Sequence, residues 1–121
     1  PHSMLARFTH IDYDRHIALV ALSVSQSKES MLGVARVILE RNQKEAEFSI
    51  VVGDPWQGKG IGAALLQRCL SIAKERGIEK VMGTVLAENT QMLALGKKFG
   101  FKIKKVLGAG EYELSIDFQK N

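Results

Sequence analysis

The stretch that decides the fold is Gly53–Cys69, with the sequence GDPWQGKGIGAALLQRC. It holds four glycines, Gly53, Gly58, Gly60 and Gly62, and continues directly into a helical pattern. Glycine costs conformational entropy on folding, so this many before a helix indicates that something approaches the bare backbone closely. The start of a helix presents free N–H groups, and these bind anions. The stretch therefore predicts a site for a phosphorylated ligand, with the ammonium of Lys59 adding positive charge.

Several kinds of glycine-rich loop compete for this pattern. A P-loop needs Ser or Thr after its Gly-Lys pair, but here Gly60 follows Gly58 and Lys59. A dinucleotide fingerprint, G-x-G-x-x-G/A, does match at Gly58, Gly60 and Ala63, and Glu88 follows where the ribose acid would be sought. However, apparent hairpin strands precede the loop and only one crossover unit follows, which is too little for a parallel dinucleotide-binding sheet. A glycine-rich turn without any ligand is the remaining alternative.

The whole chain is expected to form one α+β domain. Apolar and β-branched runs with short polar connections predict strands, antiparallel before the loop, over residues 15–24, 31–40, 45–52, 80–86, 101–106 and 111–118. Helical spacing predicts one helix from Ile61 to Gly77, and Asn89 is expected to cap a second that ends near Phe99. The segment Leu5–His10 is interpreted as the end of a helix. The expected order is βββαβαββ, a mixed central sheet flanked by two helices.

Composition narrows the possible partners. The chain has 121 residues, and a formal net charge of +4 allows an anionic ligand. The lone Cys69 cannot form an internal disulfide, which favours a reducing compartment and a cytoplasmic location. No apolar run reaches the roughly 18 residues of a membrane span, and no aromatic–basic stripe indicates nucleic acid. His10 and His16 lack metal-ligand spacing, so no metal is expected. Residues 1–4, PHSM, resemble a tag remnant, which leaves 5–121 as the domain.

Three stretches together resemble one family, the GCN5-related N-acetyltransferases (GNAT). QGKGIG, Gln57–Gly62, resembles the family's Q/R-x-x-G-x-G/A loop, which holds the pyrophosphate of acetyl-CoA. AEFSIVVGDPWQGKGIG, Ala46–Gly62, resembles its fourth strand plus loop, and AENTQMLALGKKFGF, Ala87–Phe101, resembles its N-x-x-A-…-K-x-G-F segment. The resemblance implies a GNAT fold and acetyl-CoA as the acyl donor. The donor contacts that it implies are Val51, Val52, Gln57, Gly58, Lys59, Gly60, Ile61, Gly62 and Asn89, with a plain helix cap as the alternative role of Asn89.

The segment LARFTHIDYDRHIALVAL, Leu5–Leu22, together with AEFSIVVGDPWQGKGIGAALL, Ala46–Leu66, looks like the acetyltransferase domain of bacterial Pat-type protein lysine acetyltransferases. That resemblance implies a protein lysine as acceptor, with acyl-CoA synthetases as candidate substrates, and often an attached region similar to NDP-forming acyl-CoA synthetases. The family's first strand and helix would precede Leu5. We therefore expect an N-terminally incomplete domain that self-associates or is completed by such an upstream region. Two other functions stay open: acetylation of a small amine, and acyl-CoA sensing without turnover.

Acyl transfer to lysine needs a base, because free lysine has a pKa of about 10.4. Glu47 is the candidate, since it lies within a strand pattern in which glutamate is depleted. Alternation places Glu45, Glu47, Ser49 and Val51 on one face of that strand. We expect Glu47 to be partly buried, with an exposed Glu45 as its main rival. Pat-like enzymes carry a catalytic glutamate on this strand, and a solvent-facing or salt-bridged residue is the alternative.

Two further groups complete the expected chemistry. A backbone amide at the end of the fourth strand, from Val51 or Val52, is expected to stabilise the developing oxyanion, as the family implies. Many relatives place a tyrosine general acid at the position of Gly96, so that acid is missing here. Cys69 lies on the apolar helix face and is expected to be a small core residue, not a nucleophile.

Overall fold

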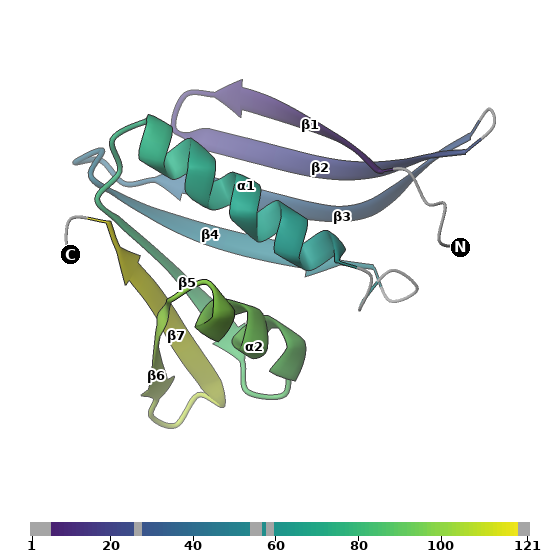
Figure 1. Ribbon diagram of the computed structural model, residues 1–121. Helices are drawn as coiled ribbons and strands as arrows, with labels where there is room; N and C mark the ends of the chain where they lie inside the picture. The colour runs from purple at the N-terminus through teal and green to yellow at the C-terminus, as the bar shows by residue number, and fades with distance from the viewer. Residues whose placement is uncertain (1–5, 26–27, 54–56, 58–59, 119–121) are drawn as a thin grey trace.

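The computed structural model describes residues 6–25, 28–53, 57 and 60–118. Within them the elements are β1 (Ala6–Tyr13), β2 (His16–Ser25), β3 (Lys28–Leu39), β4 (Glu45–Val52), α1 (Ile61–Glu75), β5 (Lys80–Leu86), α2 (Thr90–Lys98), β6 (Lys102–Val106) and β7 (Glu111–Asp117). The strands form one sheet in the order β1-β2-β3-β4-β5-β7-β6 (Figure 1). Only β4 and β5 pair in parallel, so the expected mixed α+β architecture is confirmed.

The expected helix end at Leu5–His10 is wrong for its described residues, because residues 6–10 belong to a strand. β1 pairs with β2 along its whole length, from the Ala6–Ser23 pair to the Tyr13–His16 pair. Phe8, Thr9 and Ile11 favour a pleated surface over a helix. The connection is a two-residue turn in which Asp14 has a φ of 51°, a conformation that Asp tolerates better than most residues. Four strands therefore precede α1 instead of the three expected.

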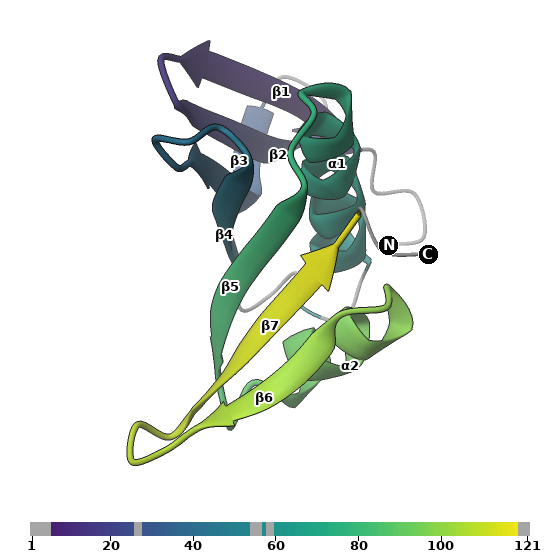
Figure 2. The same ribbon diagram turned by 90° about the vertical axis from the view of Figure 1, so that its left-hand side faces the viewer.

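Both helices lie on the same side of the sheet (Figure 2). Apolar side chains of α1 pack on β2, β3 and β4, and the resulting core includes Ile17, Leu65, Leu66 and Leu114, each fully buried. The other side of the sheet is covered by neither helix, and we call it the open face. Five large apolar side chains with exposed fractions of 44–69% lie on it: Ile11, Met31, Ile38, Val51 and Leu86.

The parallel contact between β4 and β5 is short. It consists of three residue pairs, from Glu45–Lys80 to Glu47–Met82, and beyond these pairs the two strands diverge. β5 itself continues to Leu86, paired with β7 on its other side. The divergence therefore leaves the adjoining edges of β4 and β5 without a neighbouring strand, and it determines where the candidate site lies.

Within the described part of the chain, neither helix is long and apolar enough to cross a membrane. α1 has 15 residues and α2 has 9, whereas a span needs about 20 apolar residues. The apolar residues of α1 occupy one stripe that packs on the sheet, and this is typical of a helix in a globular domain.

Candidate active site

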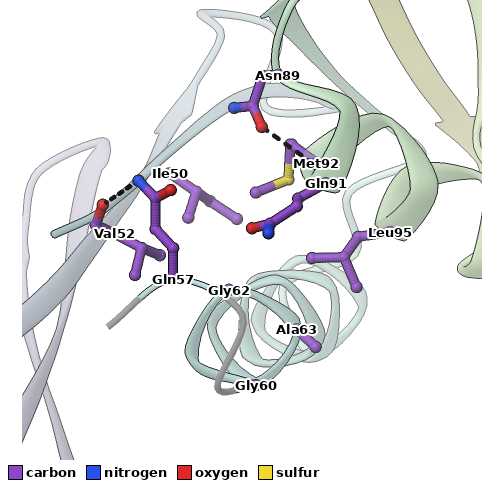
Figure 3. A pocket seen from close by; sticks show the side chains of 10 residues that line it. All are labelled: Ile50, Val52, Gln57, Gly60, Gly62, Ala63, Asn89, Gln91, Met92 and Leu95. Carbon is purple, nitrogen blue, oxygen red and sulfur yellow. Dashed lines mark hydrogen bonds between the residues drawn. The ribbon is translucent and has the colours of Figure 1, made fainter. Parts of the chain in front are cut away.

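The diverging strands open a cavity of about 320 Å³ on the side of the sheet that carries the helices. Its walls come from β4, from the start of α1 and from the first two turns of α2 (Figure 3). The lining residues are Ile50, Val52, Gln57, Gly60, Gly62, Ala63, Asn89, Gln91, Met92 and Leu95. The sequence-predicted residues Val52, Gln57, Gly60, Gly62 and Asn89 therefore meet around one cavity.

The start of α1 has the form expected of an anion site. Gly60 precedes the helix with a φ of 86°, a left-handed conformation that favours glycine, and as a glycine it has no side chain to cap the first amides. The first turn also holds no acidic residue, so these N–H groups remain suited to an anion. Gly58 and Lys59, predicted to bind the donor, lie outside the described residues.

Two predicted residues of the loop have roles in packing. The side chain of Ile61 is buried in the core, with 5% exposed, so only its backbone can face a ligand. A Cβ atom on Gly62 would lie 3.4 Å from Leu95 and 3.7 Å from Met92. The missing side chain of Gly62 therefore allows α2 to approach α1 closely at the cavity wall.

The end of β4 is connected to the loop by a side-chain hydrogen bond. Gln57 Nε2 donates to the carbonyl oxygen of Val52 at 3.0 Å (Figure 3). The N–H of Gly53 donates to Leu32 in β3 at 2.9 Å. Successive amides of a strand point to opposite edges, so the amide of Val52 points away from β3, toward the divergence. The amide of Val51 points to β3, and its side chain is 69% exposed on the open face.

Asn89 caps α2, as its alternative role predicted. Its Oδ1 accepts a hydrogen bond from the backbone N–H of Met92 at 3.1 Å (Figure 3). The side chain also lines the cavity. Because capping uses only the oxygen, the Nδ2 group of Asn89 remains a possible donor to a ligand.

Glu47 lies on the open face, at the last residue pair before β4 and β5 diverge. Its neighbours across the ladder are Ile38 in β3 and Met82 in β5. The expectation of a partly buried Glu47 beside an exposed Glu45 is wrong: Glu47 is exposed and Glu45 is half-buried. The reason is that no element covers the open face at Glu47, whereas Glu45 lies where the backbone of residue 44 meets that of residues 79 and 80.

Neither Gly96 nor Cys69 is placed for proton transfer. Gly96 is buried, and a Cβ atom there would lie 2.4 Å from a methyl group of Leu114, so α2 lies too close to β7 for a tyrosine at this position. Cys69 is 1% exposed, and burial raises the pKa of its thiol to about 12. The thiol therefore stays protonated and inert at neutral pH.

Five residues of the cavity wall were not predicted as site residues from the sequence: Ile50, Ala63, Gln91, Met92 and Leu95. Met92 and Leu95 are three positions apart on one face of the helix that Asn89 caps, and this spacing could have indicated them. Gln91 gave no such signal. The described residues contain no group of three or more His, Cys, Asp or Glu side chains arranged to hold a metal ion.

The family model of the acetyltransferase (GNAT) family matches residues 1–101. The chain therefore belongs to the GNAT family. Among curated relatives, it is 25% identical to an acetyltransferase of Pseudomonas aeruginosa over 99 residues, which cover 82% of this chain and 53% of that protein. It is 28% identical to the L-amino acid N-acetyltransferase AaaT of Escherichia coli, over 60% of this chain and 48% of the relative. The chain thus spans about half the length of these relatives.

A solved structure supports the same fold. The crystal structure of the GNAT domain of S. lividans PAT superimposes with a TM-score of 0.72 and 27% sequence identity. The superposition covers 91% of this chain and 65% of that domain. The broad GNAT resemblance is thus confirmed, while closeness to Pat-type proteins is supported only by this single neighbour.

Proposed function

We propose that this protein is an N-acetyltransferase that moves the acetyl group of acetyl-CoA directly to an amine, with Glu47 as the general base. The observation that carries the proposal is the divergence of β4 and β5. It opens a cavity on the helix side and places Glu47 beside the same opening on the open face. Donor and acceptor can therefore approach the reacting carbon from opposite sides of the sheet.

The start of α1 would hold the pyrophosphate of the donor. The backbone amides of residues 58–62 would bind its oxygens, and Lys59 would add positive charge. For Gly58 and Lys59 this assignment rests on the sequence motif alone. The pantetheine arm would then run through the cavity between β4 and α2, where Asn89 Nδ2 is a candidate donor to its amide groups. The thioester would come to rest at the divergence, near the amide of Val52.

The reaction needs one proton acceptor and one oxyanion donor. The ammonium of the acceptor loses a proton to Glu47, directly or through a water molecule, and its nitrogen attacks the thioester carbonyl. The N–H of Val52 donates to the oxygen while it carries negative charge. The C–S bond then breaks, the nitrogen gives up its second proton to water so that a neutral amide forms, and the thiolate takes a proton from water. A thiol with a pKa of about 8.5 leaves without a general acid, which agrees with a glycine at position 96.

The acceptor we propose is a lysine side chain of a protein, with acyl-CoA synthetases as the first candidates. Similarity to the GNAT domain of S. lividans PAT and the sequence resemblance of Leu5–Leu22 support this choice. A small amine is the second candidate, and similarity to an L-amino acid N-acetyltransferase favours it. A protein that senses acyl-CoA without turnover would need only a cavity that binds it, and no base. The position of Glu47 beside the opening therefore favours catalysis.

The test is incubation of the protein with isotopically labelled acetyl-CoA and a panel of acceptors, followed by mass spectrometry. The panel holds an acyl-CoA synthetase, lysine peptides and free amino acids. We expect label on an amine nitrogen of at least one acceptor, and the modified class identifies the substrate. Binding of CoA without transfer to any acceptor would contradict catalysis and support the sensing alternative.

A further inference from the structure

A second charged side chain, Arg36, lies beside Glu47 on the open face. Arg36 in β3 is directly opposite Ser49 in β4, and Ile38 is directly opposite Glu47. Arg36 and Glu47 are therefore diagonal neighbours on adjacent antiparallel strands, and such residues lie roughly 7–8 Å apart, with their Cβ atoms somewhat closer. Only the short side chain of Ser49 lies between Arg36 and the edge of β4 that borders the divergence.

These two opposite charges are within reach of each other but are not joined. Both side chains are exposed, and neither forms an ion pair or hydrogen bond with another residue of the described segments. By contrast, Arg76 and Asp12 do form an ion pair. Exposed Ile38 and Val51 flank the pair on the same face. The arrangement presents one cation and one anion, separated by a small polar gap, beside the point where the thioester would lie.

We propose that Arg36 binds an anionic group of the acceptor, so that the acceptor is an amine with a carboxylate close to the reacting nitrogen. This inference rests on the proposed function, because it assigns the acceptor side of that site. A guanidinium binds a carboxylate through two parallel hydrogen bonds. A zwitterionic acceptor would then have its ammonium toward Glu47 and its carboxylate toward β3, which fixes its orientation before the proton is removed.

The required chemistry can come from two sources. In a free α-amino acid, the carboxylate is attached to the carbon that carries the amine. In a protein, an aspartate or glutamate beside the acceptor lysine supplies it. Both present an amine and an anion within the span of Arg36 and Glu47, and both can place apolar groups on Ile38 and Val51.

The experiment compares acceptors that differ only in the anion. L-leucine is paired with leucinamide, and a peptide with aspartate beside its lysine is paired with the asparagine version. Binding to the protein in the presence of CoA, a donor analogue that cannot react, is measured by calorimetry, and kcat/KM is measured with acetyl-CoA. The variants are Arg36→Gln and, as a control with the same charge change in the β3–β4 turn, Arg41→Gln.

We expect the wild type to prefer the acidic member of at least one pair by about 10- to 100-fold, as for hydrogen bonds to charged groups. Arg36→Gln should abolish that preference, leave the neutral acceptor within about twofold and leave CoA affinity unchanged, while Arg41→Gln keeps the preference. A preference within the leucine pair identifies a free amino acid as the acceptor, and a preference within the peptide pair identifies a protein lysine beside an acidic residue. Equal binding of both members by the wild type, or an unchanged preference in Arg36→Gln, would overturn the inference.

The two proposals fail in different ways. If the wild type transfers acetyl groups but ignores the carboxylate, the inference about Arg36 is wrong and the proposed function stands. If the wild type binds the acidic acceptor preferentially through Arg36 but transfers nothing, the proposed catalysis is wrong and the anion site stands.

Discussion

At the scale of single residues, the site depends on where each side chain points more than on how deeply it is buried. Glu47 is exposed, and the catalytic role proposed for it rests on its place beside the divergence. Glu47 could be preferred to Glu45 from its place inside the strand pattern and from the family resemblance. The exposure of the two side chains could not be predicted, because it depends on which face of the sheet the helices cover and on the chain that packs beside Glu45. In the same way, Arg36 gave no signal in the sequence, since only the register of β3 against β4 brings it near Glu47.

Replacing Glu47 with glutamine tests its role as base. We expect Glu47→Gln to lower kcat by roughly 10²- to 10⁴-fold, as for loss of a positioned general base, with CoA affinity unchanged. The measurement is kcat against pH with one acceptor, together with CoA binding. Glu45→Gln is the matched control and should stay near the wild-type rate. If Glu45→Gln loses activity while Glu47→Gln keeps it, the base was assigned to the wrong residue.

Cys69 should make the fold sensitive to alkaline pH. Burial raises the pKa of its thiol to about 12, whereas an unfolded thiol titrates near 8.5. Above about pH 8.5 the unfolded chain releases a proton that the folded chain keeps, so the free energy of unfolding falls by up to about 1.4 kcal/mol per pH unit until about pH 12. Below that range the contribution is fully present.

Urea unfolding at pH 8, 9 and 10 measures this loss in wild type and in Cys69→Ala. The variant lacks the thiol, so its stability should fall less steeply with pH, even if it is less stable at pH 8. All other titratable groups are the same in both proteins, so the difference between the two slopes isolates Cys69. Parallel slopes would contradict the prediction.

At the scale of elements, the start of α1 could be predicted almost completely, because glycines followed by helical spacing are a local signal. The first strand could not. Residues 6–10 carry no decisive period, and they belong to β1 because the hairpin turn at Asp14 brings them against β2. The spacing of Met92 and Leu95 could indicate a shared face of α2, but not that this face meets the start of α1, since that depends on the close approach that Gly62 permits.

Gly60 should be essential for donor binding because of its backbone conformation. A β-branched residue at a φ of 86° costs about 1–3 kcal/mol of strain, and relief of that strain would redirect the first amides of α1. We expect Gly60→Val to weaken CoA binding by roughly tenfold or more, as measured by calorimetry. Gly77→Val is the control: its φ of 77° is equally strained, but it lies after the other end of α1. Equal CoA affinities in Gly60→Val and wild type would remove the anion-site assignment.

Gly83 should be needed where β5 passes Phe48. A Cβ atom on Gly83 would lie 2.5–2.8 Å from three atoms of the Phe48 ring, which is itself only 4% exposed. We expect Gly83→Ala to destabilise the fold by about 1–3 kcal/mol through overpacking. Phe48→Leu frees space at that position. The double variant should therefore lose less stability than the sum of the losses in the two single variants, as measured by urea unfolding. Strict additivity would show that the two residues do not compete for space.

At the scale of the whole molecule, the sheet consists of two parts joined by the short β4–β5 ladder. One part is β1–β4 and the other is β5–β7, and three residue pairs connect them directly. The cavity is lined from both parts, by β4 and the start of α1 on one side and by α2 on the other. A ligand in the cavity would therefore bridge the two parts of the sheet.

This arrangement predicts the pattern of native-state hydrogen exchange. Without ligand, amides of β5, β6 and β7 should exchange through an opening of lower free energy than amides of β2 and β3. The reason is that only the short β4–β5 ladder pairs β5–β7 with the rest of the sheet. Saturating CoA should raise protection in β5 and α2 more than in β2. Mass spectrometry of exchanged peptides measures both effects. Uniform protection that CoA raises equally everywhere would indicate a single cooperative unit.

The single-sided placement of the helices also has a consequence for how such a protein can diversify. The described residues that line the proposed donor cavity lie on the side of the helices, while Glu47, Arg36 and their apolar neighbours lie on the open face. Residues alternate between these two sides along β3 and β4, so adjacent residues in the sequence face different ligands, the donor on one side and the acceptor on the other. Mutations can therefore exchange one amine for another without altering the machinery for the shared donor. A lineage built on this sheet can change its acceptors one strand position at a time.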